Sequence, residues 1–252
     1  MSPIVIAVLV VLVAAVACIM YASRAAFVAA RGNLEYMKGN QDKAMALLEK
    51  ASRLPRVQPK HLTGYAYLLM KAGKPAEAER ILNDALPKAK GLDKMQAQVN
   101  LATAMWLQGR REEAVELLER THAEYKNTTV YGNLGYFKLL LGNDLEEALS
   151  FNLEAYGYND NDLTILDNVA QSYYMLGRYE EAAEWYAKVV AKQPKHAESY
   201  YFYAQTLRRL GRAREALEQA RTAAAKPLAL VTPLSREEPE ALAVDIEKSG
   251  MI

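Results

Sequence analysis

The chain has 252 residues, of which 24% are charged, and its formal net charge is +1. This length can form one ordinary domain or two small ones with a sizeable core. The balanced charge gives no general attraction to nucleic acid or to an anionic membrane face, and the single cysteine, Cys18, excludes an internal disulfide framework and a Cys-based metal site.

Residues 1–24 are predicted to form a transmembrane anchor. No charged side chain occurs from Met1 to Ser23, and Ile4 to Ala22 is an apolar stretch. Because a helix rises 1.5 Å per residue, roughly 20 such residues span a hydrocarbon core. Lysine and arginine occur only on the C-terminal side of this stretch, starting at Arg24. The positive-inside rule therefore predicts that the rest of the chain lies in the cytoplasm.

Two other interpretations of this segment place the protein outside the cytoplasm. The triplet Ala15-Val16-Ala17 fits an A-x-A cleavage site, and Ala17-Cys18 weakly resembles a lipoprotein processing site. The first residues carry no lysine or arginine, which a secretory signal normally supplies, and the apolar run continues past Cys18. These features favour a retained anchor.

Beyond the anchor, three columns of residues recur about every 34 positions. The alanines of the second column are 34, 36, 34, 34 and 34 residues apart. The first column contains Gly39, Gly73, Gly109, Gly142, Gly177 and Gly211. The second contains Ala44, Ala78, Ala114, Ala148, Ala182 and Ala216, and the third contains Ala51, Ala85, Thr121, Ala155, Val189 and Ala223.

Each period is predicted to hold two short helices. Residues 163–176 and 179–192 both carry apolar side chains at helical spacing. Gly177 is suited to end the first helix in a left-handed conformation, and Pro194 stops the second. The small residues at matching places in both helices allow the two axes to approach closely.

This pattern resembles the tetratricopeptide repeat over residues 25–226. The best match, 163–196, has the residues that the family expects at Tyr173, Gly177, Tyr179, Ala182, Tyr186 and Pro194. The resemblance implies an all-α fold: a single N-terminal transmembrane helix, then a right-handed α-solenoid of about six helix pairs. The expected repeats are 25–58, 59–94, 95–127, 128–162, 163–196 and 197–226. The first begins directly on the anchor, so its first helix is expected to continue the transmembrane helix.

Residues 227–252 are predicted to form a linker and a capping helix. Pro227 and Pro233 interrupt helical structure. Ser235 and Glu238 form a capping-box pattern, which predicts a helix from Arg236 to about Lys248. A cap over the last repeat is favoured, because solenoids need one. The alternative is a segment that occupies the protein's own groove.

The candidate binding site is the concave groove of the solenoid, which is lined mainly by the first helix of each pair. Asparagine can pair with the backbone of an extended peptide, and tyrosine and tryptophan are typical interface anchors. In this family, asparagine at the column of Asn133 and Asn168 also bonds between neighbouring repeats, and both roles remain open. The groove candidates are Tyr67, Asn100, Trp106, Asn133, Tyr136, Asn168, Gln171, Tyr174, Tyr201, Gln205 and Arg208.

The positions where lysine is absent, and the basic residues of the last repeat, both bear on the choice of partner. A clamp for the C-terminal carboxylates of a chaperone is disfavoured, because its lysine positions correspond to Val99, Gly132, Asp167 and Tyr201. The last repeat is locally basic, which indicates either a solvated face or a docking patch for an acidic partner. Its basic residues are Arg208, Arg209, Arg212, Arg214, Arg221 and Lys226.

No phosphate-binding loop, nucleophile–base signature or paired metal-ligand motif occurs in the chain. We therefore expect no enzymatic activity, no cofactor and no metal. The sequence predicts a membrane-anchored scaffold that binds partner peptides or helices in its groove, with other proteins and the membrane as partners and no role in nucleic-acid binding. The alternative is a membrane receptor, targeting or assembly factor for client proteins, which is extracytoplasmic if the N-terminus is a processed signal.

Overall fold

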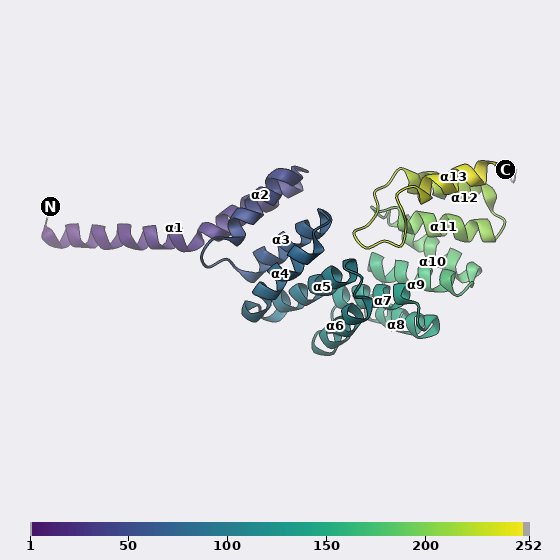
Figure 1. Ribbon diagram of the computed structural model, residues 1–252, viewed down its shortest axis with the longest axis horizontal. Helices are drawn as coiled ribbons and strands as arrows, with labels where there is room; N and C mark the ends of the chain where they lie inside the picture. Colours follow the sequence, from purple (N-terminus) through teal and green to yellow (C-terminus); the bar gives the residue numbers. More distant parts are fainter. Residues whose placement is uncertain (1, 249–252) are drawn as a thin grey trace. The chain divides into compact units, whose positions relative to one another are not determined.

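The computed structural model describes residues 2–248, and within this range every regular element is a helix (Figure 1). This confirms the predicted all-α fold. The chain separates into two compact units, Met1–Gly109 and Arg110–Ile252. The first contains α1 (Pro3–Met37), α2 (Gln41–Ser52), α3 (Pro59–Lys71), α4 (Pro75–Ala85), the short 3₁₀ helix η1 (Leu86–Lys88) and α5 (Gly91–Leu107). The second contains α6 (Arg111–Glu124), α7 (Thr128–Leu141), α8 (Leu145–Tyr158), α9 (Leu163–Met175), α10 (Tyr179–Ala191), α11 (Glu198–Arg209), α12 (Ala213–Ala224) and α13 (Glu238–Lys248).

The first helix, α1, joins the apolar N-terminal segment to the first helix pair without a break, as the sequence predicted (Figure 1). Residues 2–21 are exposed along their whole length. From Ala25 onward one side of α1 is buried and packs against α2. At Gly32 the two helices are close, since a Cβ added there would lie 2.9 Å from Cγ of Leu48. Among the described residues, α1 is the one helix long and apolar enough to cross a membrane.

In the rest of the first unit, neighbouring helices stack in chain order. Helix α3 packs against α2, α4 and α5, and α4 packs against α5. The alanines of the second sequence column lie where these helices approach: Ala44 and Ala78 are fully buried. Small side chains at these places let helix axes approach while larger apolar side chains fill the flanks.

The glycines of the first sequence column end the first helix of each pair. All six have positive φ angles, between 72° and 84°. Gly177, for example, follows α9 with φ of 75°, and its N–H donates to the carbonyl oxygen of Tyr174 at 3.0 Å. Only glycine adopts this left-handed conformation without strain, which explains why the column is glycine.

The second unit repeats the same pairing from α7 to α12. Helices α7 and α8, α9 and α10, and α11 and α12 pack pairwise, and each pair contacts the next. The column residues Ala182 and Ala216 are fully buried, as is Tyr186, the largest fully buried side chain. The stretch 176–194, rich in Glu, Tyr and Trp, is therefore a packing element with a solvated side at Glu180, Glu181 and Glu184.

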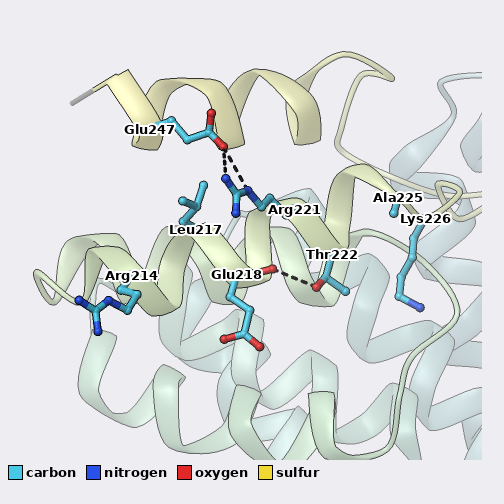
Figure 2. A pocket seen from close by; sticks show the side chains of 8 residues that line it. All are labelled: Arg214, Leu217, Glu218, Arg221, Thr222, Ala225, Lys226 and Glu247. Carbon is cyan, nitrogen blue, oxygen red and sulfur yellow. Dashed lines mark hydrogen bonds and ion pairs between the residues drawn. The ribbon is translucent and has the colours of Figure 1, made fainter. Parts of the chain in front are cut away.

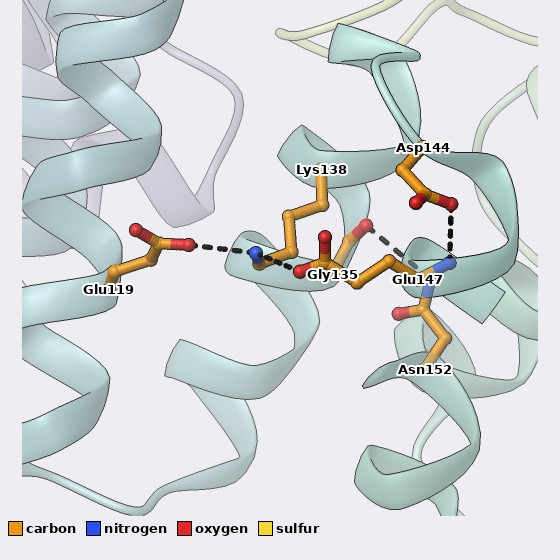
Figure 3. Close-up of polar contacts among 6 residues, drawn as sticks. All are labelled: Glu119, Gly135, Lys138, Asp144, Glu147 and Asn152. Carbon is orange, nitrogen blue, oxygen red and sulfur yellow. Dashed lines mark hydrogen bonds and ion pairs between the residues drawn. The ribbon is translucent and has the colours of Figure 1, made fainter. Parts of the chain in front are cut away.

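One close approach in this unit depends on a glycine without positive φ (Figure 3). Gly135 on α7 faces Asn152 on α8, and a Cβ at Gly135 would lie only 1.9 Å from Oδ1 of Asn152. The Nδ2 group of Asn152 donates to the Gly135 carbonyl at 3.4 Å and to Oγ of Ser172 on α9 at 3.2 Å. The absence of a side chain thus allows one buried amide to link three helices.

Lys138 on α7 links this helix to α6 and α8 (Figure 3). Its Nζ lies 2.7 Å from Glu119 on α6 and 3.0 Å from Glu147 on α8. Burial, the largest single effect, lowers the pKa of Lys138, but the hydrogen bonds to the two carboxylates together outweigh it and raise the pKa. The lysine therefore stays charged and ties α6, α7 and α8 together.

Helix α13 closes the last pair. It packs against α12 and buries Leu242 and Ile246. It begins at Glu238 rather than at the predicted Arg236, because Pro239 has no N–H and fits only in the first turn. Half of the predicted capping box is present: the Ser235 N–H donates to Oε2 of Glu238 at 2.6 Å. The C-terminal segment thus contains a cap.

Candidate partner-binding surface

The candidate surface in the second unit is formed by the first helices of its pairs, α7, α9 and α11; we call it the first-helix surface. Of the residues predicted there, Asn133, Tyr136, Tyr174, Gln205 and Arg208 are partly exposed. Asn168, Gln171 and Tyr201 are buried, with 8% or less of their surface exposed. In the first unit, Tyr67 is exposed, whereas Asn100 and Trp106 are buried.

The two buried asparagines hold the repeats together. Nδ2 of Asn168 on α9 donates to the carbonyl oxygen of Gly132 on α7 at 2.9 Å. In the first unit, Nδ2 of Asn100 on α5 donates to the carbonyl oxygen of Thr63 on α3 at 3.3 Å. This is the packing role that the sequence left open, so we do not include Asn100 and Asn168 in the proposed binding surface. Asn133, in the same column, donates to Thr129 within its own helix at 2.8 Å.

The linker 227–234 lies on the first-helix surface. The Ala197 N–H donates to the carbonyl oxygen of Pro227 at 3.0 Å, and the Ala229 N–H donates to Oε1 of Glu198 at 2.9 Å. The Tyr136 hydroxyl on α7 donates to the carbonyl oxygen of Val231 at 3.3 Å. In the C-terminal segment, α13 packs against α12, and the linker contacts α7 and the start of α11.

A cavity of about 430 Å³ lies beside the linker. Its walls come from α7, α9, α11, the loop 192–196 and the linker, and include Tyr136, Leu163, Asp167, Glu198 and Val231. Its volume falls within the range of small-ligand pockets, about 300–1,000 Å³. The cavity is thus of a size that can hold a small ligand or a side chain.

Burial raises the pKa of two ionisable groups at this cavity, Asp167 and Tyr136. The pKa of Asp167 is raised to about 7: burial, the largest effect, raises it, a hydrogen bond with Ser199 lowers it, and the nearby Glu198 carboxylate raises it. Burial, followed by the two carboxylates, also raises the pKa of the Tyr136 hydroxyl. Burial, followed by the Asp167 carboxylate, likewise raises the pKa of the buried Tyr186 hydroxyl. These hydroxyls stay protonated and neutral.

The sequence did not single out Asp167 and Glu198 as site residues. In the sequence, Asp167 served only as evidence against a carboxylate clamp. The available signal was an acidic residue beside the buried Asn168 on an otherwise apolar helix side, followed by another acid at the start of α11. No local pattern could show that the distant linker would cover both.

Three basic residues of the last repeat form ion pairs within the chain, and Figure 2 shows one of them, Arg221 with Glu247. Arg221 lies 2.7 Å from Glu247, and Arg208 lies 2.7 Å from Asp245, both on α13. Arg212, the residue before α12, pairs with Glu215 on that helix at 2.5 Å. These contacts favour the solvated, internally neutralised face over a docking patch for an acidic partner.

The stacked helix pairs and the asparagine bonds between them define a helical-repeat protein of the solenoid class. Two family models match the chain: the tetratricopeptide repeat over residues 95–120, and subunit 3 of the anaphase-promoting complex, or cyclosome, over residues 138–223. These matches and the helix pairs support a tetratricopeptide repeat fold for the chain.

Solved structures share this fold at low sequence identity. A tetratricopeptide repeat protein from Parabacteroides merdae is 17% identical, with a TM-score of 0.62, over 89% of this chain and 86% of that one. PilF of Pseudomonas aeruginosa is 18% identical, with a TM-score of 0.62, over 87% and 97%. A chain in the structure of the APC/C hetero-tetramer Cut9–Hcn1 is 14% identical, with a TM-score of 0.71, over 88% of this chain and 42% of that chain. No curated protein sequence matches the chain.

Proposed function

We propose that the protein is a membrane-anchored scaffold that binds an extended segment of a partner protein on its first-helix surface. The observation that carries the proposal is the position of the linker 227–234. It is held there through its backbone N–H and carbonyl groups, by Glu198 and Tyr136. Because every polypeptide has these backbone groups, the same surface can hold an extended segment of another protein.

The fold supports this proposal at a coarser level. Tetratricopeptide repeats commonly act in protein–protein interaction, and both a matched family model and a similar structure are named for parts of a multiprotein complex. Partly exposed tyrosines such as Tyr136 and Tyr174 offer large contact areas at low entropic cost. No part of the proposal requires catalysis.

Capture of partners by the full chain in detergent micelles tests the surface. We expect the double variant Tyr174→Ala/Gln205→Ala to lose most of the partners that the natural chain captures from the membrane fraction of its own cells. The matched control is Glu180→Ala, on the exposed side of α10, which should capture the same partners as the natural chain. Equal capture by all three proteins would show that the first-helix surface is not the binding site.

The membrane anchor is α1. Its residues 2–21 are exposed and apolar, so a surrounding bilayer would remove a large apolar area from water. The lysines and arginines that follow favour the cytoplasmic side for the repeats. Protease treatment of intact cells, or spheroplasts where there is a wall, tests this topology: the repeats should be protected until the membrane is opened. Digestion from outside would show that the repeats are extracytoplasmic.

A further inference from the structure

Two carboxylates at the cavity beside the linker lack complete hydrogen bonding. Glu198 is 7% exposed; its Oε1 accepts from the Ala229 N–H, but its Oε2 has no partner. Oδ1 of Asp167, one helix away on α9, has no partner either. Both residues line the cavity. Native proteins satisfy nearly all buried polar atoms, so two unpaired acceptors at one cavity indicate a missing donor.

A cationic donor would satisfy these acceptors and balance their charge. Two neighbouring carboxylates in a buried site repel each other, and removing them from water is costly unless a cation pairs with them. Within the described residues neither carboxylate forms an ion pair. Lys192, Lys195 and His196 also line the cavity, but all three are exposed, and the Lys192 ammonium is bonded to Asn161. Above the pKa of Asp167, no basic side chain of the described residues neutralises the two carboxylates.

The walls of the cavity fit the rest of a cationic side chain. Leu163, Pro194, Ala229 and Val231 supply apolar surface next to the two acids. Lysine and arginine have this same pattern, an aliphatic stem that packs on apolar surface and a charged head that needs acceptors. A neutral side chain would fill the walls but leave both oxygens unpaired.

We propose that this cavity binds the side chain of a lysine or arginine of a partner polypeptide, with Glu198 Oε2 and Asp167 Oδ1 accepting hydrogen bonds from its cationic group. The proposal rests on the proposed function, since it names the chemistry of the partner. Both oxygens have almost no accessible surface while the linker is in place. The linker wall therefore shifts at Ala229 and Val231 when the side chain enters.

The test follows the Ala229 methyl group by NMR in the full chain, labelled at its alanine methyls and held in detergent micelles. The probes are the blocked tripeptides acetyl-Gly-Lys-Gly-amide and acetyl-Gly-norleucine-Gly-amide, which differ in the ammonium group. We expect a saturable shift with lysine and none with norleucine. Glu198→Gln keeps an acceptor for the Ala229 N–H but replaces the Oε2 acceptor with an amide. It should weaken lysine binding about tenfold or more, because the lost bond is charge-assisted.

Two further variants keep the result interpretable. Asp167→Asn should weaken binding by a similar factor and replaces Glu198→Gln if that variant does not fold. Glu215→Gln, an exposed acid paired with Arg212 on α12, should bind as the natural chain does. The proposal would be overturned by equal shifts with both tripeptides. It would also be overturned if a folded acid-to-amide variant bound the lysine tripeptide within twofold of the natural chain. A cavity that holds water alone predicts these results. Lysine binding together with failed partner capture would overturn only the proposed function.

The variant Tyr136→Phe separates the proposal from a general attraction of the lysine to negative charge, which predicts no change in binding. It removes the hydroxyl that holds the carbonyl of Val231 and leaves both acids in place. Without this hydrogen bond, less free energy is needed to move the linker away from the cavity. The lysine tripeptide should therefore bind more tightly than it binds to the natural chain. Weaker binding in this variant would contradict the linker's role as a movable wall.

Discussion

Asn168 and Gly132 are joined by a hydrogen bond of 2.9 Å from a side-chain amide to a main-chain carbonyl, from α9 to the first helix of the preceding pair. Asn100 makes the corresponding bond to Thr63 in the first unit. Each asparagine lies two positions before a fully buried alanine of its own helix, Ala170 in α9 or Ala102 in α5, and each asparagine is itself buried. The asparagine column thus fixes how one pair is placed on the next.

Replacing Asn168 with alanine should therefore affect stability more than partner capture. The change removes a buried hydrogen bond, and we expect a loss of roughly 1–3 kcal/mol. The control is Asn133→Ala in the same column, whose amide bonds only within α7; it should change stability by less than about 0.5 kcal/mol. Urea unfolding followed by circular dichroism compares them. Equal midpoints for the two variants would contradict the assigned role of Asn168.

Gly135 and Gly157 give a second matched pair. An alanine at Gly135 would bring its Cβ against Oδ1 of buried Asn152 and displace the amide that links α7, α8 and α9 (Figure 3). Overpacking of this kind costs about 1–3 kcal/mol, occasionally more. Gly157, on α8, has open space where its Cβ would be, so Gly157→Ala should be neutral or slightly stabilising. Thermal melting of both variants measures the difference, and a Gly135→Ala protein as stable as Gly157→Ala would refute the close approach.

The cap makes a prediction about α13. Ile246 is fully buried against the last pair, whereas Val244 on the same helix is 40% exposed. Ile246→Ala should cost about 2–4 kcal/mol, while Val244→Ala should cost well under 1 kcal/mol. Hydrogen exchange of α12 amides provides the readout, since a lost cap should first increase exchange in the helix that it covers. Equal exchange in the two variants would mean that α13 does not stabilise α12.

The sequence predicted the features that repeat and missed those that depend on distant contacts. The glycine and alanine columns recur because each pair has the same turn and the same close approach, so Gly177 and Ala182 could be assigned by comparison with their equivalents. Trp106 and Tyr201 were expected at the groove but are buried. The first helix of a pair packs against the second helix and also against the neighbouring pairs. Its exposed face is therefore narrower than the face predicted from one helix pair alone. The contact of Tyr136 with Val231 joins residues 95 positions apart. No repeat pattern encodes it.

Asp167 predicts how stability changes with pH. Its pKa is raised from 3.8 to about 7 in the folded protein, mainly by burial. Between these two values the folded state binds a proton that the unfolded state releases, so stability falls as pH rises from about 4 to about 7. The other charged groups at the cavity are Glu198, Lys192, Lys195 and His196, and they are the same in the natural chain and in Asp167→Asn. The difference in stability between these two proteins therefore isolates Asp167.

Asp167→Asn should be more stable than the natural chain at pH 8, by roughly 1–4 kcal/mol, because a buried charge is replaced by a neutral amide. The advantage should shrink as pH falls and vanish near pH 4, where the natural aspartate is protonated in both states. Urea midpoints of both proteins at pH 4, 6 and 8 measure this trend. A saturating concentration of the lysine tripeptide should reduce the advantage at pH 8, since the bound cation pairs with the natural carboxylate and stabilises the folded state through binding. A constant difference across the pH range would show that Asp167 titrates alike in the folded and unfolded states.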